Sequence, residues 1–273
     1  MTRPLPLGFA FAGVRCGLKN KRNDVGILLS DRPARAAGVF TTNRVRAACV
    51  DLCREHLADG TLRAVVVNSG NANCCTGDQG ARDARRTAEI AAEALGLRPE
   101  EIAVSSTGVI GHLLDMAKLE RGVRAAADAL GDDPNPFKEA ILTTDLVEKE
   151  AVAAVRGTGA VVYGVAKGSG MIAPNMATML VYLATDADAD GLDLAGIVAR
   201  VADRTFNRMS VDTDTSTNDS CLVLANGASG ERPTETALEE ALHAVMLSLA
   251  KQVARDGEGA TKLIEVTVEG SPD

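Results

Sequence analysis

The chain has 273 residues, enough for one large α/β domain or two moderate ones with a sizeable core. Its net charge of −8 and the lack of a basic run argue against nucleic acid as a partner. No stretch approaches the ~20 apolar residues of a membrane span, and the first residues do not form a secretory leader. Composition therefore predicts a cytoplasmic globular protein with neither a nucleic-acid nor a membrane partner.

Short apolar segments that end in Gly, Asn or Asp alternate with segments in which Ala, Glu, Arg and Leu recur every three or four residues. The first kind predicts strands, at 25–30, 37–41, 62–68, 102–106, 151–155, 160–166, 179–184, 220–225 and 262–268. The second kind predicts helices, at 79–95, 117–130, 192–203 and 234–255, whereas 131–136 and 231–233 are expected to be loops. Because the strands come in clusters, layered sheets and helices of an α+β type are favoured over a doubly wound sheet.

Two polar runs follow expected strands and are candidates for a binding pocket. The first is Asn68-Ser69-Gly70-Asn71-Ala72-Asn73, for which a substrate pocket and a simple polar turn both stay open. The second contains Thr107 and Gly108, a hydroxyl next to an N–H that no side chain shields. Two such donors that converge on one point form an oxyanion hole, although many strand-to-helix turns share this pattern.

The segment 167–183, KGSGMIAPNMATMLVYL, is the most informative part of the chain. A glycine-rich, proline-broken approach leads to Ala177-Thr178 and then directly into an apolar strand. If the chain cleaves itself between these two residues, Thr178 gains a free α-amine beside its hydroxyl. An α-amine with a pKa near ~8 can take the hydroxyl proton, so one residue supplies nucleophile and base. The alternative for this segment is a loop that leads into a core strand.

Other charged residues and the cysteines give weaker indications. The run Asp212 to Ser216 lacks the preceding strand of a phosphotransfer motif and the Gly and Glu of a calcium loop, so a hydrogen-bonded turn that braces a site is expected. Lys167 suits a carboxylate and Glu258 suits a cationic group, with simple exposure to solvent as the alternative for both. Six cysteines and three histidines show no zinc spacing, so reduced thiols and no metal are expected.

Taken in order along the chain, the motifs resemble those of the ornithine acetyltransferase (glutamate N-acetyltransferase) family of arginine biosynthesis. The resemblance covers essentially the whole chain, and its longest segment is unusual enough to make chance agreement remote. The matching segments are GFAFAGVRCGLK, AAGVFTTN, VVVNSGNANCCTGDQG, SSTGVIG, ILTTD, KGSGMIAPNMATML, FNRMSVDTDTSTND and DGEGATK.

The resemblance implies a layered αββα sandwich and cleavage at Ala177-Thr178 into residues 1–177 and 178–273. These two chains would stay bound and pair again into an α2β2 heterotetramer. Thr178 matches the family's nucleophile, and Thr107 and Gly108 match its oxyanion hole. The substrate-binding positions are matched by Thr144, Lys167, Thr178 and Glu258.

The implied reaction moves the acetyl group of N2-acetylornithine to L-glutamate through an ester on Thr178, without a cofactor. Whether acetyl-CoA also serves as a donor stays open. Family chains continue beyond residue 273 and add an Asn and a Ser or Thr to the pocket, so this chain is expected to be a fragment or a shortened homologue. The alternatives are a self-processed aminopeptidase or amidase of related architecture and an inactive truncated homologue.

Overall fold

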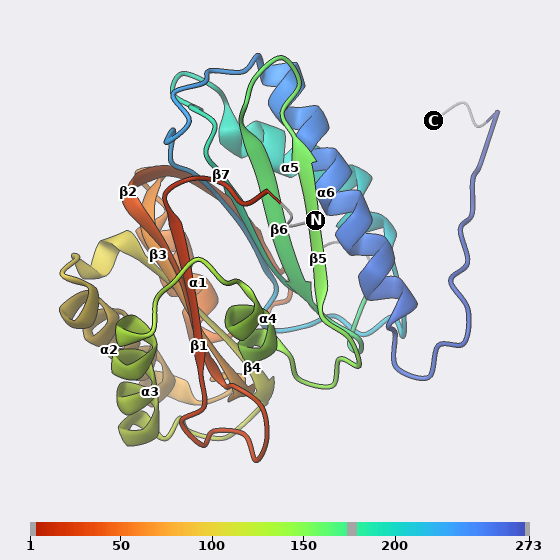
Figure 1. The fold of residues 1–273 in the computed structure, drawn as a ribbon. Coiled ribbons are helices and arrows are strands. Elements are labelled where there is room, and N and C mark those ends of the chain that lie inside the picture. The colour runs from red at the N-terminus through yellow and green to blue at the C-terminus, as the bar shows by residue number, and fades with distance from the viewer. Residues whose placement is uncertain (1–3, 174–178, 271–273) are drawn as a thin grey trace.

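A computed structural model describes residues 4–173 and 179–270, which form a mixed α/β fold (Figure 1). The described strands form one sheet in the order β4-β3-β2-β8-β7-β6-β5, and β1 pairs with β2 at its side. The strands are β1 (Phe9–Val14), β2 (Val25–Phe40), β3 (Thr61–Asn71), β4 (Ile102–Val109), β5 (Lys149–Ala154), β6 (Val161–Lys167), β7 (Leu180–Thr185) and β8 (Ser220–Ala225). The α-helices are α1 (Ala48–His56), α2 (Gly77–Leu95), α3 (Met116–Asp128), α4 (Asn135–Ile141), α5 (Leu194–Arg204) and α6 (Glu235–Arg255), with 3-10 turns at Pro99–Glu101 and Phe206–Arg208.

The two halves of the sheet face each other across a shared apolar core. The long strand β2 pairs with β3 from Val25 to Arg35 and with β8 from Arg35 to Phe40, and its register with β3 shifts between Leu29 and Ala34. The ring of Phe11 on β1 contacts the ring of Tyr163 on β6, with the ring centroids 5.9 Å apart. Three strands separate β1 from β6 in the sheet order, so this contact requires the sheet to fold over onto itself.

Helices cover the two outer faces of this folded sheet. On one side α2 packs on β3 and β4, α1 packs beside β4, and α3 packs on β1 and β2, with buried alanines and leucines at these contacts. On the other side α5 and α6 pack on β5 to β8 (Figure 1). The helix–sheet–sheet–helix layers confirm the αββα sandwich that the motifs implied. No helix among the described residues is both long and apolar enough to cross a membrane.

The last helix shows how the sequence pattern produces this packing. Thr234 caps α6, since its hydroxyl accepts a hydrogen bond from the Ala237 N–H. Leu238, Leu242, Val245, Leu249 and Val253 recur along one face, and all five are buried against the sheet, as the spacing predicted.

Several expected elements differ from the observed ones. The strands expected at 25–30 and 37–41 are the two ends of the single strand β2. The strand expected at 262–268 is not formed, and its apolar residues Ile264, Val266 and Val268 are 77–80% exposed. A strand needs a neighbour for its backbone hydrogen bonds, and the described chain places none beside this segment.

The sequence patterns missed β1 and two short helices. Helix α1 has only nine residues, among them two cysteines, a valine and a histidine, and α4 begins within the loop that was expected at 131–136. Proline is tolerated in the first turn of a helix, where its missing N–H has no partner to lose. Phe137 of α4 is fully buried between the sheet halves, so tertiary packing stabilises a helix too short to be stable alone.

The aromatic contact between the sheet halves gives a stability prediction. We expect Phe11→Ala to lower the free energy of unfolding by about 3–5 kcal/mol, because a buried ring that bridges both halves is lost. Urea denaturation followed by circular dichroism measures this change. As a control, Leu7→Ala alters a side chain of a residue that is 59% exposed and should change the value by less than about 0.5 kcal/mol. A loss below about 1 kcal/mol for Phe11→Ala would contradict the proposed packing.

Candidate functional site

A cavity of about 580 Å³ brings together segments that are remote in the sequence. Its lining includes Thr107, Gly108, Thr144, Lys167 and Glu258, which are all the predicted site residues among those described. Ala177 and Thr178, the predicted cleavage point and nucleophile, lie outside the described residues. A second hollow of about 600 Å³ beside α6 contains only Glu258 of the predicted set. The first cavity is therefore the candidate site.

Thr107 and Gly108 lie at the end of strand β4 rather than in a loop after it. There β4 pairs in parallel with β3, and the register is irregular because Asn71 faces both Thr107 and Val109. Gly108 has a φ of +132°, and a Cβ at this position would lie 2.4 Å from the carbonyl carbon of Gly70. Only glycine fits there, because the backbones of β3 and β4 lie too close together for a side chain. Gly108 itself is exposed to the cavity.

Lys167 ends strand β6 at the floor of the cavity. Its side chain is not solvated, since the residue is only 4% exposed, and its Nζ donates to the Thr107 Oγ1 over 3.3 Å. Burial lowers the pKa of the Lys167 ammonium, and the carboxylates of Asp145 and Asp219 oppose that effect. The alternative of a solvated lysine is therefore wrong, and Lys167 is a buried residue at the lining of the cavity.

Thr144 and Glu258 reach the cavity from two other segments, which Ser169 links. The Thr144 hydroxyl is 2.8 Å from the Ser169 hydroxyl, and the Glu258 N–H donates to the Ser169 carbonyl over 2.6 Å. Both residues are exposed, so both side chains are accessible to a ligand. The Glu258 carboxylate lies directly against Gly170, where a Cβ would come within 2.6 Å of its carboxyl carbon.

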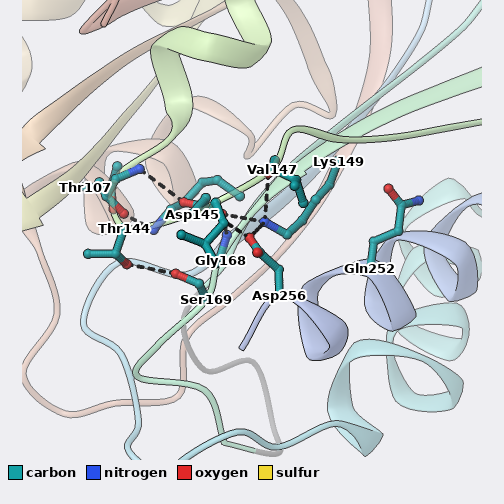
Figure 2. Close-up of polar contacts among 12 residues, drawn as sticks. Thr107, Thr144, Asp145, Val147, Lys149, Gly168, Ser169, Gln252 and Asp256 are labelled. Atoms are coloured by element: carbon teal, nitrogen blue, oxygen red, sulfur yellow. Dashed lines mark hydrogen bonds and ion pairs between the residues drawn. The ribbon is translucent and has the colours of Figure 1, made fainter. Parts of the chain in front are cut away.

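Behind the cavity, a buried lysine joins the segments that carry these residues. Figure 2 shows the side chain of Lys149 reaching between Asp145 and Asp256. Its Nζ is 2.7 Å from Asp145 Oδ1, 2.6 Å from Asp256 Oδ2 and 3.2 Å from the Val147 carbonyl, so all three N–H donors are used. The same Asp145 oxygen accepts from the Gly168 N–H over 2.7 Å. Lys149 therefore ties together the neighbours of Thr144, Lys167 and Glu258.

The charges of this cluster stabilise one another. Burial by itself raises the pKa of the Asp145 carboxyl, but the ammonium groups of Lys167 and Lys149 outweigh that effect and the pKa falls below its ordinary value. The sequence patterns did not single out Lys149, Asp145 or Asp256. Asp145 and Lys149 are four residues apart across a loop, and Asp256 is more than one hundred residues away, so only the fold brings them together.

The turn at 212–216 braces the site, as its sequence predicted. The Asp212 carboxylate accepts from the Met171 and Ile172 N–H groups over 2.6 and 2.7 Å. On the other side of the undescribed residues 174–178, Asp219 Oδ1 accepts from the Met179 N–H over 2.7 Å. Among the described residues there is no group of three or more His, Cys, Asp or Glu that could hold a metal ion.

Comparison with known proteins places the chain in a family. The model of the ArgJ family matches residues 10–273. The chain belongs to the ArgJ family. It is 51% identical to the arginine biosynthesis bifunctional protein ArgJ of Symbiobacterium thermophilum over 97% of this chain and 69% of that protein. It is 48% identical to that of Thermotoga neapolitana over 98% of this chain and 70% of that protein. Membership confirms the family, and the acyltransferase class, that the motifs predicted.

Solved structures agree with the family assignment. An ArgJ chain from Bacillus halodurans is 42% identical, with a TM-score of 0.58 over 63% of this chain and 92% of that chain. An ornithine acetyltransferase from Mycobacterium tuberculosis in complex with ornithine is 40% identical, with a TM-score of 0.60 over 64% of this chain and 93% of that chain. The PH0078 protein of Pyrococcus horikoshii is 11% identical with a TM-score of 0.55 and shares the fold.

The buried cluster gives a second stability prediction. We expect Lys149→Met to lower the free energy of unfolding by about 3–5 kcal/mol, because it leaves two buried carboxylates without their shared cation. The double variant Lys149→Met/Asp256→Asn should recover part of the loss, since one of those carboxylates is removed. Urea denaturation compares them.

The control for this experiment is Lys118→Met, which removes an exposed ion pair with Asp115. Its cost should stay below about 1 kcal/mol. If Lys149→Met proves as stable as the Lys118 variant, the buried cluster does not hold the segments together.

Proposed function

We propose that this chain transfers the acetyl group of N2-acetylornithine to L-glutamate through an ester on Thr178. The observation that carries the proposal is the meeting of Thr107, Gly108, Lys167 and Glu258 around one cavity in a member of the ArgJ family. These residues offer hydrogen-bond donors for an oxyanion and opposite charges for the two ends of an amino acid. The solved relative in complex with ornithine supports the proposal, because ornithine is the product of the first step.

The reaction proceeds in two acyl transfers. The Thr178 Oγ attacks the acetyl carbonyl, its proton passes to the α-amine of Thr178, and the amide bond breaks as ornithine leaves with a proton. The neutral amine of glutamate then attacks the ester carbonyl, forms the new amide and returns the hydroxyl to Thr178. Thr107 and Gly108 stabilise the oxyanion in both steps. No water is consumed and no redox change occurs.

Charge orients the donor in the cavity. Lys167 is a buried cation next to Thr107 and suits the α-carboxylate, which lies close to the reacting amide. Glu258 is exposed, its backbone N–H is bonded to the Ser169 carbonyl, and its carboxylate suits the side-chain ammonium of ornithine. Thr144 supplies a further hydroxyl to the lining of the cavity.

The free α-amine of Thr178 requires cleavage of the chain after Ala177. We include this cleavage in the proposal, with residues 1–177 and 178–273 as the two products, which pair again into an α2β2 assembly. Two observations support it. Asp212 and Asp219 hold the backbone on both sides of the segment, at Ile172 and Met179. The solved ArgJ chain and the solved ornithine acetyltransferase chain also cover 63–64% of this chain with 92–93% of their own length, as a chain that ends near residue 177 would.

The nucleophile assignment is tested by Thr178→Ala. We expect a single intact chain and no acetyl transfer, because both the attacking hydroxyl and the cleaved α-amine are lost. Mass spectrometry of the purified protein and an assay for N-acetylglutamate measure the two effects. Thr236→Ala, at an exposed position of α6, should split and react like the wild type. Transfer by the intact Thr178→Ala chain would refute the assignment.

The same assay separates the alternatives. Acetylornithine is offered with and without glutamate, and ornithine release is followed. Release that does not depend on glutamate indicates an amidase that uses water as the acceptor. Acetyl-CoA with glutamate, in place of acetylornithine, tests the second donor. A chain that neither splits nor reacts is an inactive homologue.

Thr107→Val tests the oxyanion hole. Valine keeps the shape of threonine but removes the hydroxyl donor, so we expect acetyl transfer to fall by about 10²- to 10³-fold. Thr107→Ser keeps a hydroxyl and should restore most of the rate. Near wild-type transfer by Thr107→Val would exclude this hydroxyl from the oxyanion hole.

A further inference from the structure

The proposed function sets an electrostatic problem inside one cavity. Acetylornithine carries a positive ammonium at the end of its side chain, whereas glutamate carries a negative carboxylate there. The two molecules bind in turn to the same site. Glu258 suits the first side chain and repels the second, so the glutamate carboxylate needs a cation of its own.

Two cations line the cavity among the described residues, Lys19 and Lys167. Lys167 is next to Thr107 and is assigned to the α-carboxylate that both substrates share. The other charged lining residues, Asp212, Asp214 and Glu258, are all acidic. Lys19 is therefore the cavity cation without a role in binding the donor.

The fold holds Lys19 firmly at the wall of the cavity. It belongs to the loop between β1 and β2, and the buried carboxylate of Asp24 accepts hydrogen bonds from the N–H groups of Cys16, Gly17 and Lys19 over 2.7–3.0 Å. The Lys19 side chain lies against Gly70, where a Cβ would come within 2.9 Å of its Cγ. The Lys19 side chain is thus positioned by the backbone hydrogen bond to Asp24 at its base and by the contact with Gly70 along its stem.

Lys19 lies beside both the oxyanion pair and the Thr144 segment. The stem of Lys19 contacts Gly70, and the backbone of Gly70 closely approaches Gly108. The Lys19 ammonium donates to the carbonyl of Leu142 over 2.8 Å, and Leu142 lies two residues before Thr144. A molecule whose carboxylate binds this ammonium would share the cavity with Thr107 and Gly108.

The Lys19 ammonium is suited to receive a further ligand. An ammonium has three N–H donors, and the contact with Leu142 uses one of them. The carboxylates of Asp24, Glu139 and Asp145 act on it electrostatically, and those of Asp24 and Asp145 already accept hydrogen bonds from backbone N–H groups and from Lys149. Burial lowers the pKa of Lys19 to about 8, so the side chain is mostly charged at neutral pH, and an arriving carboxylate favours the charged form.

We infer that Lys19 binds the side-chain carboxylate of L-glutamate and selects the acceptor of the second transfer, while Glu258 selects the donor of the first. The inference rests on the proposed function. It assigns the two half-reactions to two oppositely charged contacts in one cavity. Because the transfers are separated by the Thr178 ester, kcat/KM for each substrate reports only its own half-reaction.

The test is Lys19→Met in the full chain, with both kcat/KM values measured. Methionine keeps the apolar stem that lies on Gly70 but removes the ammonium. We expect kcat/KM for glutamate to fall about 10- to 100-fold, the factor for a lost hydrogen bond to a charged group. The value for acetylornithine should stay within about twofold of wild type, since the donor brings no carboxylate to this point.

Glutamine provides a matched second readout, because it replaces the side-chain carboxylate with a neutral amide. The wild type should prefer glutamate over glutamine, K19M should lose most of this preference, and Lys19→Arg should keep it. A merely structural lysine would not change this ratio. If K19M does not fold, Lys19→Gln keeps a donor for the Leu142 carbonyl and is expected to show the same loss of preference.

Lys21→Met is the control, since Lys21 is exposed in the same loop and does not line the cavity. It should leave both kcat/KM values unchanged. Equal losses for both substrates in K19M, or an unchanged preference for glutamate over glutamine, would overturn the inference. If the wild type makes no N-acetylglutamate at all, the proposed function itself is wrong, which is a separate outcome.

Discussion

The arrangement of the cavity depends on the buried ammonium of Lys149 and the two carboxylates that it binds. A charge in an apolar interior is costly unless it is fully paired, and here all three donors of the ammonium are used. The pairing therefore acts as a constraint. It fixes the loop before β5, the end of β6 and the segment after α6 relative to one another, and each of these segments contributes one side chain to the lining of the cavity.

The folded sheet provides the frame for this constraint. β4 contributes Thr107 and Gly108 from one half of the sheet, and β6 contributes Lys167 from the other half. The aromatic contacts of Phe11 and Phe137 hold the halves together, so the hydrogen bond between Lys167 and Thr107 spans the two layers. Glycine at position 108 allows the backbones of β3 and β4 to approach closely where the cavity begins.

Much of the fold was predictable because its signals are local. The stripe of Leu238 and Leu242 gives α6, and the apolar run at 220–225 gives β8 with its observed bounds. The failures have physical causes. Helix α4 is stabilised by the burial of Phe137 rather than by local helix propensity. Strand β2 reads as two strands because polar residues and a proline, Asp31 to Pro33, interrupt its apolar pattern where its register with β3 shifts. The alternating pattern around Val266 predicts a strand, but a strand forms only beside a partner.

By itself the sequence determined the family, the layered fold class and the residue types that the proposed chemistry needs, because these are carried by ordered motifs such as that around Thr178. Only the tertiary structure decided that Lys167 is buried rather than solvated, that Lys149 joins three remote segments, and that Lys19 lines the same cavity. The reason is that burial and charge pairing depend on contacts between residues far apart in the chain. The sequence gives the position of each lysine in the chain, whereas its burial and its charge partners follow only from the folded structure.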